Sequence, residues 1–68
     1  MNYNIEYERE EDGRWIAEVP KLPGVLAYGT TADDAMRKAE ALALRVLADR
    51  LEMAESSPLP ISIAFATV

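Results

Sequence analysis

Acidic side chains gather near the start of the chain, where half of its twelve acids fall within the first eighteen residues. These acids are Glu6, Glu8, Glu10, Glu11, Asp12 and Glu18. One interpretation is a solvated strand face and hairpin tip, where charge suppresses edge-to-edge aggregation. The other is a docking surface for a basic protein, with an aromatic anchor beside the acids. The candidate partner-binding residues of the second interpretation are Glu8, Glu10, Glu11, Asp12 and Trp15.

The other residue types offer little support for catalysis. The chain contains no histidine and no cysteine, so the common general base and the most reactive nucleophile are both missing. Metal-dependent phosphodiester cleavage would need several convergent carboxylates, and residues 61–68 contain none. The three glycines are isolated and form no phosphate-binding loop. The sequence therefore predicts a protein that is not an enzyme and that holds no metal or cofactor.

The charge balance favours a protein partner over nucleic acid. The net charge is −5, and binding to a phosphate backbone needs clustered Lys and Arg. A basic protein suits this charge better. The first residues carry no apolar signal core, and no apolar run approaches the length of about 18 residues that a membrane span needs. We therefore expect a cytoplasmic chain without membrane contact.

Alternation of apolar and polar residues predicts strands at residues 3–7, 15–19, 25–28 and 61–68. An Asp12-Gly13 turn joins the first two, and Pro20 and Pro23 mark the next connection. A helix is expected over residues 31–53. The sequence thus predicts an α+β fold with two layers in the order β-β-β-α-β. Its mixed four-stranded sheet has three antiparallel strands and a fourth parallel to one of them, with one helix on one face. We expect one domain, residues 1–68.

The helix carries its own start signals and a wide apolar face. Thr31 suits the N-cap, with Asp34 in a capping-box position, and Asp33 and Asp34 each face a cation four residues later, Arg37 and Lys38. One narrow apolar stripe consists of Ala35, Ala39, Leu42, Val46 and Met53. A second apolar line beside it consists of Leu44, Leu47 and Leu51. This second line is either part of a broad core face or the contact with a second subunit.

The length of the chain and its lack of disulfides favour self-association, whichever of these alternatives holds for the leucines. A domain of 68 residues buries only about 60% of the surface that its unfolded chain exposes. Since cysteine is absent, oligomerisation is the remaining common way to bury more apolar surface. We therefore expect a homodimer or a larger homo-oligomer.

Two ordered blocks resemble the HicB-like antitoxin family. Residues 11–24 contain an acidic turn, an aromatic residue, an Ala-Glu-Val-Pro segment and a Leu-Pro-Gly segment in the order found in that family. Gly29, Thr30 and Thr31, followed by Asp33, Asp34 and Ala35, resemble the family's Gly-x-Thr start of an acidic, alanine-rich helix. The two blocks cover about half of the chain.

The resemblance implies a partial ribonuclease-H-like fold that generally lacks the catalytic carboxylates. It also implies a role, which is to neutralise a small, basic, mRNA-cleaving toxin of the HicA type by direct binding and occlusion. Longer members carry a C-terminal DNA-binding domain, and we expect none here, so the chain alone should not bind nucleic acid. Two alternatives are an orphan structural or regulatory homo-oligomer with the same fold and a degenerate ribonuclease-H-like nuclease.

Overall fold

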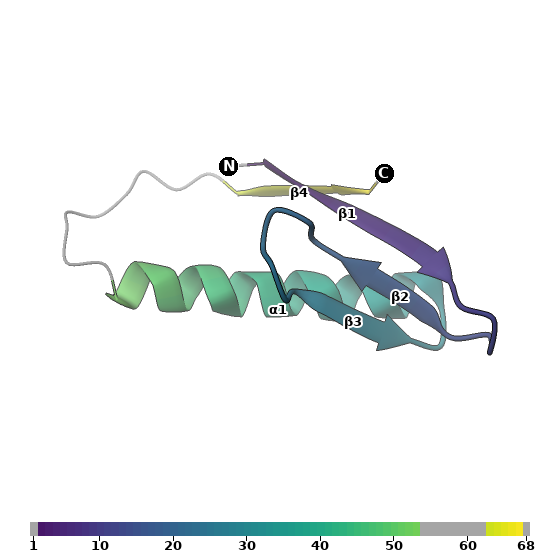
Figure 1. Cartoon of the computed structure of the whole chain (residues 1–68). Coiled ribbons are helices and arrows are strands. Elements are labelled where there is room, and N and C mark those ends of the chain that lie inside the picture. Colours follow the sequence, from purple (N-terminus) through teal and green to yellow (C-terminus); the bar gives the residue numbers. More distant parts are fainter. Residues whose placement is uncertain (1, 54–62, 68) are drawn as a thin grey trace.

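A computed structural model describes residues 2–53 and 63–67 of the chain. Its elements follow the expected β-β-β-α-β order (Figure 1). They are β1 (Asn2–Arg9), β2 (Trp15–Glu18), β3 (Leu26–Gly29), α1 (Ala32–Met53) and β4 (Ala64–Thr67). The predicted α+β class is confirmed, with a single helix packed on a mixed four-stranded sheet. The predicted fourth strand is confirmed for residues 64–67. Ile63 is described but precedes the strand, while residues 61, 62 and 68 lie outside the described part.

The sheet has the strand order β3-β2-β1-β4. The pairs β1–β2 and β2–β3 are antiparallel, and β1–β4 is parallel, as predicted. The two halves of β1 pair with different neighbours. Residues 2–5 lie beside β4, with Tyr3 opposite Phe65, and residues 6–9 lie beside β2, with Glu6 opposite Glu18. The long first strand therefore joins two parts of the sheet.

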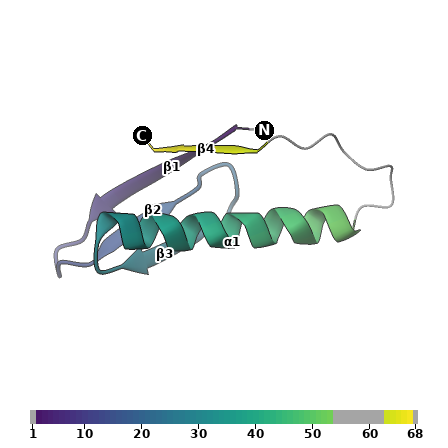
Figure 2. The ribbon, with the colours of Figure 1, turned by 180° about the vertical axis from the view of Figure 1, so that it is seen from behind.

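The core lies between the sheet and α1. The helix packs on β1, β2 and β3, and β2 and β3 lie in front of α1 in Figure 1 and behind it in Figure 2. Ala35, Ala39 and Ala43 are fully buried. Their small side chains let the helix backbone approach the sheet closely, because no larger group separates the two layers. The other buried residues are Tyr3, Ile5, Ala17, Val19, Leu22 and Val25.

A close backbone contact fixes the step from β3 into α1. A Cβ added to Gly29 would lie 2.9 Å from the Cα of Ala35 and closer still to its backbone nitrogen. Both atoms belong to the first turn of the helix, which cannot move without displacing α1 from the sheet. Glycine is therefore required at position 29 because no side chain fits there. The sequence alone did not reveal this role.

The helix start follows the prediction in part. The Thr31 Oγ1 accepts a hydrogen bond from the Asp34 backbone N–H at 3.0 Å, so Thr31 is the N-cap. The Asp34 carboxylate accepts from the backbone N–H of Thr30 instead of that of Thr31. It also pairs with Lys38, as predicted, and with Arg37. The expected Asp33–Arg37 pair is wrong. Arg37 pairs instead with Asp34, whose carboxylate is already held in place by the hydrogen bond from the Thr30 N–H.

The predicted apolar stripe is wrong at its C-terminal end. Met53 is 82% exposed, whereas Leu42 and Val46 are partly buried against the core. A helix of 22 residues extends about 33 Å, but the four-residue strands β2 and β3 extend only about 14 Å. The end of α1 therefore runs past these strands (Figure 1).

The hairpin between β1 and β2 also differs in detail. The sequence predicts a turn centred on Asp12-Gly13. In the structure the loop has three residues, Glu11 to Gly13, closed by a bond from the Glu10 N–H to the Arg14 carbonyl. Gly13 alone has a positive φ there, 91°, as in a turn followed by a glycine bulge. The extra residue sets the register that places Glu6 opposite Glu18.

Among the residues that the structure describes, no helix is both long enough and apolar enough to cross a membrane.

A candidate protein-binding face

The sheet face opposite α1 carries most of the distinctive side chains, and we call it the open face. Side chains alternate along a strand, and paired residues share a face. Since Ala17 is buried beneath α1, its neighbours Ile16 and Glu18 lie on the opposite side. The strand pairing extends this assignment across the sheet. The open face of β1, β2 and β3 then consists of Asn2, Asn4, Glu6, Glu8, Ile16, Glu18, Leu26 and Tyr28.

Three carboxylates dominate the open face. Glu6 and Glu18 are directly opposite each other, and Glu8 is two residues along β1. All three side chains are exposed. The ion pairs of the described residues involve only Asp12 and Asp34 as acids, so these glutamates lack a salt bridge there. Like charges that face each other directly on neighbouring strands destabilise a sheet. The fold tolerates this destabilisation between Glu6 and Glu18.

Apolar side chains lie beside the carboxylates. Leu26 and Tyr28 on β3 are each 42% exposed. Ile16 lies between Tyr28 and Glu8 in the sheet, and Glu18 lies between Leu26 and Glu6. A shallow hollow of about 270 Å³ is lined by Glu6, Glu8, Ile16, Glu18 and Tyr7. Aromatic and aliphatic groups bordered by charge are the usual composition of a protein-binding surface.

The hairpin tip is partly neutralised by its own arginine. The Arg14 Nε lies 2.7 Å from the Asp12 carboxylate, and the Arg14 guanidinium stacks 4.5 Å from the centre of the Tyr28 ring. The backbone N–H of Arg14 donates to the same carboxylate and, with the guanidinium, lowers the pKa of Asp12 below 3.8. The side chain of Asp12 is therefore already engaged within the chain.

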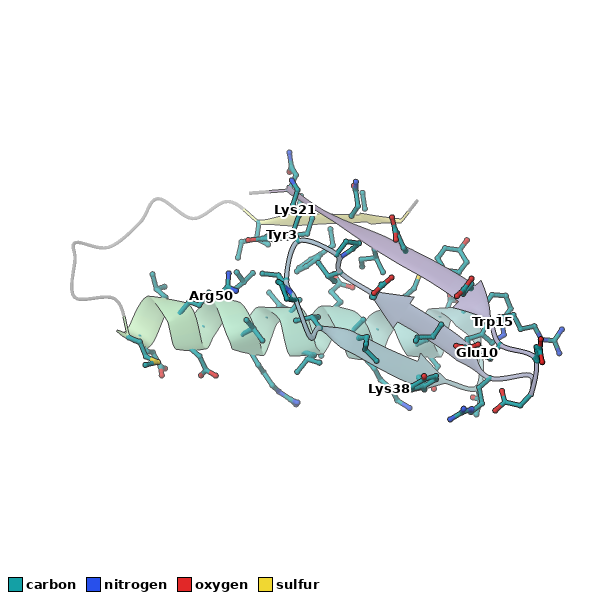
Figure 3. The ribbon with its side chains drawn as sticks, in the orientation of Figure 1. Tyr3, Glu10, Trp15, Lys21, Lys38 and Arg50 are labelled. Carbon is teal, nitrogen blue, oxygen red and sulfur yellow. The ribbon has the colours of Figure 1, made fainter. Side chains whose placement is uncertain are left out.

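The structure separates the predicted partner-binding residues into three places. Glu8 lies on the open face, and Glu10, Glu11 and Asp12 form the hairpin tip. Trp15 is paired with Arg9 and packs against the core on the α1 side, 6.1 Å from the ring of Tyr7. Figure 3 shows Trp15 near Glu10, at the hairpin end of the molecule. The predicted aromatic anchor thus lies on the other side of the sheet from Glu8.

Sequence reasoning missed the exposed pair Leu26 and Tyr28 and did not single out Glu6 and Glu18. The strand register identifies the two glutamates. With a three-residue hairpin loop, the residue numbers of each β1–β2 pair add up to 24, so Glu6 must face Glu18. Tyr28 could have been found by the same reasoning from its pairing with Ile16.

The carboxylates of the open face do not form a metal centre. No group of three or more acidic side chains in the described residues has the geometry to hold a metal ion. Side chains on an extended strand diverge from the sheet surface, so Glu6, Glu8 and Glu18 present separate charges. This arrangement suits several separate cations on a partner surface.

The predicted oligomer contacts differ in exposure. Leu44 is 47% exposed and Leu51 is 37% exposed. Leu47 is partly buried and packs against the core. The leucine line therefore divides between the two alternatives, since one member supports the core and two remain open.

Comparisons of the chain with protein-family models, with curated proteins and with solved structures give no match.

Proposed function

We propose that the chain is a protein-binding module of the antitoxin type, whose open face binds a small basic protein. The observation that carries the proposal is a set of exposed glutamates, Glu6, Glu8 and Glu18, that form no salt bridge with the described residues and lie beside the exposed apolar groups of Leu26 and Tyr28. Lys and Arg side chains of a partner would relieve the like-charge repulsion and gain apolar contact at the same time.

The sequence resemblance to HicB-like antitoxins names the class of partner. It would be a small, mRNA-cleaving toxin of the HicA type, occluded by direct binding. The β-β-β-α-β order supports this proposal because it agrees with the partial ribonuclease-H-like fold that the resemblance implies. The chain would act by binding, in the cytosol where mRNA is cleaved.

Co-expression tests the proposal. The chain carrying a tag is expressed with the small basic open reading frame beside its gene, and binding and growth rescue are scored together. We expect co-purification and restored growth with the wild-type chain. The triple variant Glu6→Gln, Glu8→Gln, Glu18→Gln should lose both. A matched tip variant, Glu10→Gln with Glu11→Gln, changes one partly buried and one exposed acid at the hairpin tip and should retain both. Failure to bind the neighbouring product would reject the proposal.

A second candidate function is a structural or regulatory homo-oligomer, favoured by the exposure of Leu44 and Leu51. It uses a different face of the molecule, so the two functions are compatible.

A further inference from the structure

One helix leaves part of the sheet uncovered on the α1 side. A helix is about 10 Å wide and strands lie about 4.8 Å apart, so α1 can cover two to three of the four strands. It packs on β1, β2 and β3, which leaves β4 at the margin. There a hollow of about 480 Å³ opens between α1 and the sheet. Its apolar lining is Ile5, Met36 and Phe65, and its polar rim includes Asp33, Arg37 and Glu40.

The exposed leucines continue this hollow along the helix. At about 100° per residue, Met36, Glu40, Leu44, Leu47 and Leu51 fall within one arc of about 80°. Met36 and Glu40 line the hollow, so the leucines follow them on the same side of α1. We call this side, from Met36 to Leu51, the leucine flank. Toward its C-terminal end it is apolar and ends in the exposed Leu44 and Leu51.

We propose that the leucine flank binds α1 of a second copy of this chain, in the antiparallel direction, to form a two-fold dimer. In this arrangement the partner's helix lies beside residues 42–53 of α1, and by symmetry α1 does the same for the partner.

Charge selects this face for a second copy. α1 carries five acids and four bases, a net charge of −1, and the leucine flank presents three leucines that complement their own copies. The open face carries Glu6, Glu8 and Glu18 without salt bridges in the described residues. Two open faces in contact would bring six such carboxylates together, and like charges facing each other in an interface cost several kcal/mol. A second copy therefore belongs on the leucine flank, and the open face stays free for a basic partner.

The positions of the leucines set the geometry of the dimer. A two-fold axis that buries both sets of Leu44, Leu47 and Leu51 passes between Leu47 and Ala48. Leu44 of one chain then lies beside Leu51 of the other, and the small Ala48 side chain permits a close helix approach of about 8–10 Å. A standard interface buries about 800 Å² per partner, about a sixth of the 4990 Å² accessible surface of this chain.

Mass measurement tests the dimer. The wild-type chain should have twice the 7.5 kDa chain mass by light scattering at micromolar concentration. Leu44→Glu with Leu51→Glu should halve the mass while circular dichroism stays unchanged, because both side chains are exposed. The matched control Leu26→Glu changes an equally exposed leucine on the open face and should leave the dimer intact. A monomeric wild type, or a double variant that stays dimeric, would overturn the proposal.

Cross-linking tests the orientation without disturbing the leucines. The chain has no cysteine, so one introduced thiol reports on one position. Ala48→Cys lies next to the proposed axis and should be joined to its copy by a short thiol cross-linker. Glu40→Cys, on the same flank, would lie about 22 Å from its copy along the helix and should not. Equal cross-linking at both positions, or none at Ala48→Cys, would contradict the antiparallel dimer.

Discussion

The like-charge pair on the open face makes a prediction in which stability and binding change in opposite directions. Glu18 lies opposite Glu6 and diagonally across from Glu8. Replacing Glu18 by Gln removes two repulsions, and replacing it by Lys converts both into attractions. Both variants should therefore be more stable than the wild-type chain, with Lys gaining about twice as much as Gln.

The register sets the size of the gain. Directly opposed side chains lie about 5 Å apart and diagonal ones about 7.5 Å apart. In water these separations give repulsions of about 0.8 and 0.6 kcal/mol, which a Debye length of about 8 Å reduces to about 0.4 and 0.2 kcal/mol. Glu18→Gln should thus stabilise by about 0.6 kcal/mol and Glu18→Lys by about 1.2 kcal/mol. For a domain of this size the Lys variant should melt about 5–10 °C higher.

Thermal melts at two salt concentrations test this reasoning. At about 1 M salt the Debye length falls to about 3 Å, and the gain of the Lys variant should shrink to about a third. The same variant should bind a basic partner less tightly, because it places a cation where the partner's cations would lie. Absence of stabilisation, or a gain that salt does not reduce, would refute the assignment of these carboxylates to one face.

Three further predictions concern the helix start. Gly29→Ala should destabilise the fold by about 1–3 kcal/mol, because its Cβ would collide with the Ala35 backbone; an unchanged denaturation midpoint would contradict this contact. Thr31→Ala should destabilise the fold by about 1 kcal/mol through loss of the N-cap, measured by urea titration. The control Thr30→Ala should cost less, because Thr30 bonds to Asp34 only through its backbone N–H. The Lys38 side chain, the Thr30 N–H and Arg37 lower the pKa of Asp34 below 3.8. The ionised Asp34 carboxylate therefore stabilises the fold fully above the unfolded-state pKa, and this stabilisation is lost as the pH falls through the lower folded-state pKa. In thermal melts at acidic pH, the Asp34→Asn variant should lose less stability with falling pH than the wild-type chain.

Much of the fold could be predicted because local signals agreed with one another. Thr31 caps the helix as its residue type suggests, and the alternation of Tyr3 and Ile5 places both in the core. The parallel position of β4 follows from the helical connection. Each of these depends on neighbours in sequence or on a general rule of chain topology.

The failures have a common physical origin in lengths and registers that only the assembled fold sets. Met53 has the correct helical period, but the strands beneath α1 are too short to reach it. Trp15 is near the acids in sequence, yet strand alternation turns it to the other side of the sheet from Glu8. The sequence places Leu22 in a connector between strands, but the residue is only 2% exposed. Backbone hydrogen bonds among Val19, Leu22 and Val25 fold this connector toward the core.

The measurement that tests the proposed binding face most directly is a calorimetric titration of the chain with the product of a small basic open reading frame adjacent to its gene. We expect binding that weakens with salt, at least about a tenfold loss for the triple variant Glu6→Gln, Glu8→Gln, Glu18→Gln, and little change for Glu10→Gln with Glu11→Gln. Equal affinity of the triple variant and the wild-type chain would contradict a role for the open face.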